Sequence, residues 1–96
     1  MPVATDITIA LSGILRDYCN GVADLSLASA TTVRDALHQV ERQNAKVYAS
    51  VCDETGAVRR HVGVFVNEDH IRELKGLDTP LAPGDVVSLL PAVSGG

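Results

Sequence analysis

The sequence predicts one domain of the α+β class, a mixed sheet of about four to five strands with one main helix packed on one face. Residues 6–12 and 59–67 alternate apolar and polar side chains, the period-two pattern of strands with one buried face. Residues 33–40 carry apolar side chains at the spacing of a helix that packs on a sheet. Residues 86–90 are apolar at nearly every position, which is typical of a central strand.

The first predicted strand, at residues 6–12, directs three aliphatic side chains to one face: Ile7, Ile9 and Leu11. Residues 13–21 then form a connection that ends at Asn20-Gly21, a dipeptide that favours turns because it tolerates positive φ. A second strand is expected at residues 22–28, where the apolar residues are Val22, Leu25 and Leu27. Two strands this close in sequence predict an antiparallel hairpin.

The predicted helix begins after Thr32, which is expected to be its N-cap. Asp35 follows at the spacing of a capping box and favours the positive end of the helix dipole. The apolar stripe recurs at i, i+3, i+4 and i+7, namely Val33, Ala36, Leu37 and Val40. His38 lies on the opposite, polar side, so we expect it to be solvent-exposed rather than catalytic. The helix should end near Asn44.

Residues 45–58 leave two alternatives open, a short helical turn or an irregular edge segment. The third strand is expected at residues 59–67, where the core face carries Val62, Val64 and Val66. Phe65, the single Phe of the chain, then lies on the opposite face beside Gly63.

The last part of the chain is predicted to contain short connections and one long strand. Residues 70–72 are expected to form a very short returning strand, and residues 76–81 a partly 3₁₀ connection with Leu77 and Leu81 turned inward. Pro83-Gly84 fits positions i+1 and i+2 of a type II turn. The final strand follows at residues 86–90.

The final strand needs a neighbour on each edge, and we expect the first strand on one side and the third on the other. A right-handed crossover places the helix on one face. This is the arrangement of a β-grasp domain, expected over residues 1–91, with a flexible tail at residues 92–96. The other face stays open, and near the base of the tail we expect a partner-docking face made of Gly63, Phe65, Leu90 and Pro91.

Several function classes are disfavoured by composition. A net charge of −4 does not suit nucleic-acid binding. The sequence shows neither an apolar run of about 20 residues nor a signal-peptide pattern, which predicts a cytoplasmic protein without a membrane partner. In that compartment Cys19 and Cys52 are expected to be free thiols. No phosphate-binding loop, metal-ligand spacing or acid/base pair is visible, so we name no catalytic residue, metal site or bound cofactor, and expect a protein that is not an enzyme.

The C-terminal residues Gly95 and Gly96 lack side chains, so the carboxylate can enter a slot too narrow for any β-carbon. The residues after Pro91 reach roughly 17 Å when extended. Another protein's active site could therefore hold Gly96 while the folded body stays outside. The alternative is a frayed terminus without function.

The sequence resembles the ThiS/MoaD family, small β-grasp sulfur-carrier proteins that are prokaryotic relatives of ubiquitin. The resemblance covers essentially the whole chain and is strongest in Leu77-Asp78-Thr79-Pro80-Leu81 and in the Gly-Asp-x-Val, apolar strand, Pro and Gly-Gly series of residues 84–96. It is closest to the actinobacterial branch that delivers sulfur to amino-acid or secondary-metabolite biosynthesis. Two departures are Gly63, where relatives commonly have Asn, and Ser94, where Ala is frequent.

The resemblance implies that an E1-like adenylyltransferase uses ATP to adenylate the Gly96 carboxylate. A sulfurtransferase or another sulfide source then converts it to a thiocarboxylate. A biosynthetic enzyme, for which a pyridoxal-phosphate enzyme is one candidate, accepts the sulfur. Val93, Ser94 and Gly95 would thread the tail into each partner. Two alternatives within the resemblance are the small subunit of molybdopterin synthase and a ubiquitin-like protein modifier, and an ordinary binding domain with a dispensable tail is a third.

Overall fold

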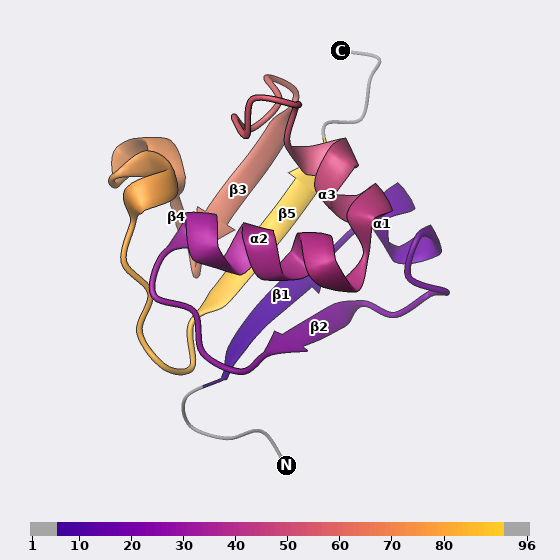
Figure 1. The fold of residues 1–96 in the computed structure, drawn as a ribbon. Helices are drawn as coiled ribbons and strands as arrows, with labels where there is room; N and C mark the ends of the chain where they lie inside the picture. Colours follow the sequence, from indigo (N-terminus) through magenta and orange to yellow (C-terminus); the bar gives the residue numbers. More distant parts are fainter. Residues whose placement is uncertain (1–5, 92–96) are drawn as a thin grey trace.

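The computed structural model describes residues 6–91, and it contains a five-stranded mixed sheet in the order β2-β1-β5-β3-β4 (Figure 1). β1 (Ile7–Leu11) pairs antiparallel with β2 (Asp24–Leu27), as the hairpin prediction requires. β5 (Val86–Pro91) lies between β1, to which it is parallel, and β3 (Val62–Val66), to which it is antiparallel. The predicted central position of the last strand is therefore confirmed.

The predicted helix is α2 (Val33–Gln43), and it begins where the sequence indicates. The Thr32 hydroxyl accepts a hydrogen bond from the Asp35 N–H at 3.1 Å. Asp35 Oδ2 accepts one in return from the Thr31 N–H at 3.0 Å. This reciprocal pair satisfies two backbone donors at the start of the helix.

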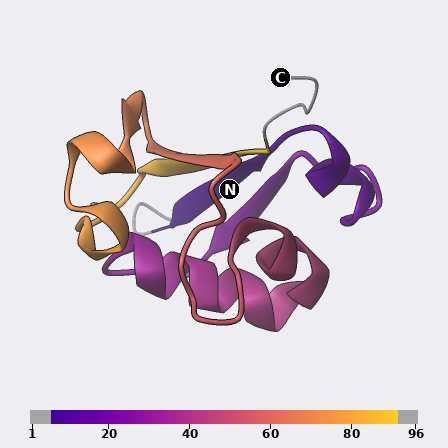
Figure 2. The same ribbon diagram turned by 90° about the horizontal axis from the view of Figure 1, so that it is seen from above.

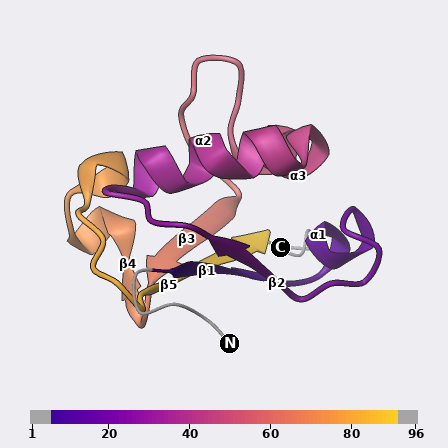
Figure 3. The same ribbon diagram turned by 60° about the horizontal axis from the view of Figure 1, so that its bottom comes forward.

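A second helix, α3 (Ala45–Val51), follows α2 directly and decides between the alternatives left open for residues 45–58. Asn44 ends the first helix and caps the second, because its side-chain oxygen accepts hydrogen bonds from the N–H groups of Lys46 and Val47. Val47 and Val51 are buried. Figure 3 shows both helices on one side of the sheet, and none of the described helices covers the other side.

The core lies between the sheet and these helices (Figure 2). The alternate residues predicted for burial in the first and third strands are all buried, and so is the whole apolar stripe of α2. β5 contributes Val87 and Leu89 to the same core. Leu77 and Leu81 pack against its rim, as expected for residues turned inward.

Three predicted boundaries are wrong, each for a local reason. β3 begins at Val62 rather than at residue 59, because the Val62 N–H donates to the Arg59 carbonyl at 3.0 Å and closes a turn. β2 begins at Asp24, and Val22 is 47% exposed instead of buried. The returning strand, β4, is Asp69–His70, since Ile71–Glu73 form a 3₁₀ turn, η1.

The turns near the end of the domain follow the sequence closely. The Asp85 N–H donates to the Ala82 carbonyl at 3.0 Å, and Gly84 has a φ of 90°, as position i+2 of a type II turn requires. The predicted 3₁₀ connection is η2 (Gly76–Asp78).

No sequence pattern predicts α1 (Ile14–Asp17), which lies in the predicted connection between the first two strands. Its Leu15 is fully buried. The ideal Cβ position of Gly13, just before α1, lies 3.7 Å from Pro91 Cγ, so this short helix sits beside the end of β5.

We predict that Thr32→Ala lowers the free energy of unfolding by about 1 kcal/mol, because the N–H of Asp35 loses its cap. Chemical denaturation of both proteins measures the difference. Thr31→Ala is the matched control, since the Thr31 backbone N–H still reaches Asp35 after substitution. Equal losses in the two variants would contradict a capping role for Thr32.

Candidate functional site

The predicted docking face lies where β3 and β5 run side by side on the open side of the sheet. Gly63 is opposite Leu90 in the register, and Phe65 is opposite Ser88. Val62, Val64 and Leu89, the partner of Val64, are buried, so strand alternation directs Gly63, Phe65 and Leu90 to the open face. Leu90 is 42% exposed.

Pro91 departs from this arrangement. It pairs with Val62, whose side chain is buried, so alternation directs Pro91 toward the helix-covered side of the sheet. The structure thus brings three of the four predicted docking residues together on one face. The fourth lies at the strand end, beside α1.

Gly63 explains how Phe65 lies on the sheet. A Cβ on Gly63 would be 3.1 Å from Phe65 Cε1, which is closer than ordinary van der Waals contact. The Phe65 ring therefore leans over the space that a side chain at Gly63 would fill. The ring also contacts His70 of β4, edge to face, with 4.9 Å between the ring centroids. The ring is held between two strands and stays partly exposed.

A hollow of about 480 Å³ lies at the point where the described chain ends, and we call it the tail-exit hollow. Ile14 on its rim is 52% exposed. Sequence reasoning missed this contribution of α1, and the only available signal was an Ile-Leu pair after Ser12-Gly13. The hollow is lined by Ile14, Leu15, Tyr18, Ser50, Arg59, His61 and Pro91.

The predicted site of covalent chemistry, Gly96, lies outside the described residues, and so do Val93, Ser94 and Gly95. What the structure places is the strand that leads to them. β5 pairs on both edges, and its last residues, Leu90 and Pro91, are still in register with β3. The base of the tail is therefore fixed in the middle of the sheet.

Within residues 6–91, no group of three or more His, Cys, Asp or Glu side chains is placed to hold a metal ion. In the same range, no helix is long and apolar enough to cross a membrane.

The Asp53 carboxylate accepts two hydrogen bonds from Thr55, the stronger influence coming from the Thr55 hydroxyl and the next from the Thr55 N–H. These hydrogen bonds hold the pKa of Asp53 below its ordinary value.

Cys19 and Cys52 are free thiols, as predicted, and the structure shows that both are buried. Cys52 is only 2% exposed. Burial raises the pKa of the Cys52 thiol, although a hydrogen bond with Tyr48 acts in the opposite direction. Burial, followed by the nearby Cys52, also raises the pKa of Tyr48. A thiol with a raised pKa stays protonated at neutral pH and is a poor nucleophile.

Comparison with known proteins decides the family. The model of the ThiS family matches residues 9–96, which is nearly the whole chain. The chain belongs to the ThiS family. The match includes both the strand that ends the described domain and the Gly-Gly terminus.

Similar proteins support both the family and the fold of this ThiS-family chain. "Sulfur carrier protein CysO" of Mycobacterium tuberculosis is 32% identical over 93 residues, which are 95% of this chain and 99% of the relative. The CysO fold in the crystal structure of the Amycolatopsis orientalis BexX/CysO complex superimposes with a TM-score of 0.83 at 31% identity, covering 94% of this chain and 99% of the other. The solution structure of small archaeal modifier protein 1 of Methanosarcina acetivorans superimposes with a TM-score of 0.81 at 28% identity, covering 96% of this chain and 97% of the other. The β-grasp assignment is thereby confirmed.

We predict that Cys52 reacts slowly with a disulfide reagent such as DTNB in the folded protein. Because folding raises the pKa of Cys52 above its unfolded value, the thiolate forms at higher pH in the folded protein. A Cys19→Ala variant leaves Cys52 as the only thiol. Its labelling rate should rise at higher pH than the rate of the same variant unfolded in guanidinium. Coincident pH profiles would contradict the prediction.

Proposed function

We propose that this chain is a sulfur carrier protein that donates sulfur from a thiocarboxylate at Gly96. The observation that carries the proposal is the placement of β5. This central strand, paired on both edges, leads directly into the residues that end in Gly95-Gly96. A CysO relative of nearly equal length, named as a sulfur carrier, supports the same function.

The chemistry needs no catalytic group on this chain. An oxygen of the Gly96 carboxylate attacks the α-phosphate of ATP on an E1-like enzyme, and pyrophosphate leaves. Hydrosulfide then attacks the carbonyl carbon of the acyl adenylate, the bond to AMP breaks, and the thiocarboxylate remains. Its sulfur is a nucleophile, which a biosynthetic enzyme uses to form a carbon–sulfur bond. In this scheme the carrier is a co-substrate rather than an enzyme.

The folded body supplies recognition. An apolar surface on the open face of the sheet is formed by Gly63, Phe65 and Leu90. Leu90 lies one residue before the end of the described chain. Ile14 is a second exposed apolar residue near the end of β5, on the rim of the tail-exit hollow. An enzyme that docks on Leu90 would have the start of the tail next to its contact surface. A partner that binds CysO is known from the BexX/CysO complex, and we propose an equivalent partner for this chain.

A protein modifier is the second candidate function. The structural match to small archaeal modifier protein 1 supports it. In that case, the activated Gly96 carbonyl would be attacked by a lysine amine instead of by sulfide. Both functions use the same adenylated terminus, so the nucleophile distinguishes them.

We expect incubation with an E1-like activating enzyme, ATP and sulfide to raise the intact mass by the difference between one sulfur and one oxygen atom. Mass spectrometry of the whole protein detects the exchange. Deletion of Gly96 should abolish it, whereas Ser94→Ala, which keeps the Gly-Gly terminus, should retain it. A mass gain in the truncated protein would refute the proposed site. Laddered conjugates on a denaturing gel would favour the modifier instead.

We expect Leu90→Lys to lower kcat/KM for adenylation at least about tenfold, because a charge replaces an apolar contact of the docking face. Val22→Lys is the matched control, since Val22 is similarly exposed, 47% against 42%, and belongs to the loop before β2. The far-ultraviolet circular dichroism of both variants should match the unchanged protein. Equal kinetics for the two variants would exclude Leu90 from docking.

A further inference from the structure

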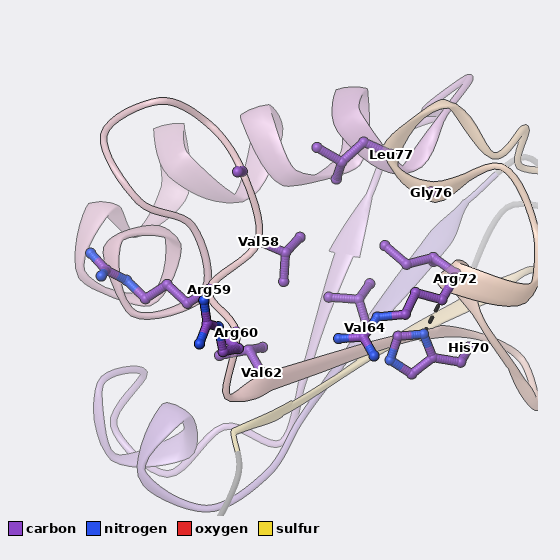
Figure 4. A pocket seen from close by; sticks show the side chains of 11 residues that line it. Val58, Arg59, Arg60, Val62, Val64, His70, Arg72, Gly76 and Leu77 are labelled. Atoms are coloured by element: carbon purple, nitrogen blue, oxygen red, sulfur yellow. Dashed lines mark hydrogen bonds between the residues drawn. The ribbon is translucent and has the colours of Figure 1, made fainter.

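The edge of the sheet beside β3 is only partly covered. β4 pairs with Phe65 and Val66, and no strand of the described chain pairs with Val62 or Val64 on that side. A hollow of about 220 Å³ occupies the uncovered place (Figure 4), and we call it the arginine hollow. Its apolar lining comes from four separate segments: Val58, Val62, Val64, Ile71 and Leu77.

The charged groups of the lining are all arginines. Arg59, Arg60 and Arg72 line the arginine hollow together with His70, and no Asp or Glu does. This is notable in a chain with 12 acidic residues, eight Lys and Arg, and a net charge of −4. Guanidinium groups beside apolar side chains favour ligands that combine carboxylates with an apolar group.

Two of the arginine side chains are free to bind. Arg59 Nε donates to the Ala49 carbonyl at 2.9 Å, so this side chain is held in place. Within residues 6–91 the one salt bridge joins Arg34 and Asp78, and neither Arg60 nor Arg72 has a carboxylate partner there. Figure 4 shows the Arg72 side chain running past Val64 and His70.

The size of the hollow indicates what it holds. Small-molecule pockets usually measure about 300–1,000 Å³, and the arginine hollow is smaller, about 220 Å³. This volume suits one aliphatic side chain rather than a whole small ligand. A second copy of the chain is disfavoured, because antiparallel pairing of two such edges would bring two sets of arginines together.

We propose that the arginine hollow binds an acidic segment of a partner protein. One aliphatic side chain of the segment seats between Val58 and Leu77, the two half-buried apolar residues of the lining. Carboxylates on either side of it pair with Arg60 and Arg72. This surface is separate from the docking face at Leu90, and binding there does not use Gly96.

A titration of the ¹⁵N-labelled full chain with blocked pentapeptides tests the proposal. The probe is acetyl-Asp-Glu-Leu-Glu-Asp-amide. Two control peptides each remove one feature. Asn-Gln-Leu-Gln-Asn lacks the carboxylates, and Asp-Glu-Gly-Glu-Asp lacks the aliphatic anchor. We expect the probe to shift the amide signals of Val58, Val62 and Leu77. Each control should bind at least about tenfold more weakly, since one aliphatic anchor or one set of charge-assisted hydrogen bonds is worth that factor.

Matched variants show whether the arginines carry the binding. Arg72→Gln should lower the affinity for the probe peptide several-fold. Arg72→Lys keeps the charge and should lower the affinity less. Arg42→Gln removes the same charge from the exposed end of α2 and should leave binding unchanged. Any of three results would overturn the proposal: no shifts around the hollow, equal binding of the glycine control, or equal losses for Arg72→Gln and Arg42→Gln. Concentration-dependent shifts of these signals without peptide would do the same, because a second copy would then occupy the hollow.

Discussion

The pairing of β5 on both edges is the interaction on which the rest of the structure depends. Its parallel ladder with β1 and its antiparallel ladder with β3 join the first and last parts of the domain. α2 and α3 can cover one face because this sheet is continuous across β5. The same ladders fix the point at which residues 92–96 begin. A mobile strand in this position would deliver the terminal carboxylate imprecisely to any enzyme.

The open face owes its shape to one missing side chain. Because Gly63 has no Cβ, the Phe65 ring can lean along its own strand and reach His70 at the same time. A larger residue at this position would force the aromatic ring to lie differently. The shape of the surface next to Leu90 therefore depends on this one position.

The sequence predicts the parts of the fold that depend on periodic burial. The alternation in β1 and β3, the stripe of α2 and the cap at Thr32 are all found as expected, because each is a local pattern with one physical explanation. The predicted returning strand shortens to Asp69–His70, since His70 Nδ1 accepts a hydrogen bond from the Arg72 N–H and starts a 3₁₀ turn instead. No local pattern indicates this contact.

Prediction was weakest where tertiary contacts decide. α1 has four residues, too few for a periodic signal, and it is held by the burial of Leu15. The side on which Pro91 lies depends on the exact register between β3 and β5. The arginine hollow combines residues 57–60, β3, His70, the η1 segment and η2, which lie within residues 57–77 but come together only through the turns between them. Of the candidate site, sequence reasoning could supply the residues on β3 and β5, but neither α1 nor the basic edge.

The order of the strands also governs when the domain can form during synthesis. β5 is the last of the described strands to leave the ribosome, yet β1 and β3 meet only through it. Until then, the hairpin and the helices lack the partner that closes their core, and non-local pairing of this kind is slow. The tail emerges after β5, so a nascent chain offers no terminal glycine before its sheet can close. In the proposed function, folding of the sheet and availability of Gly96 for activation are thereby coupled through chain order alone.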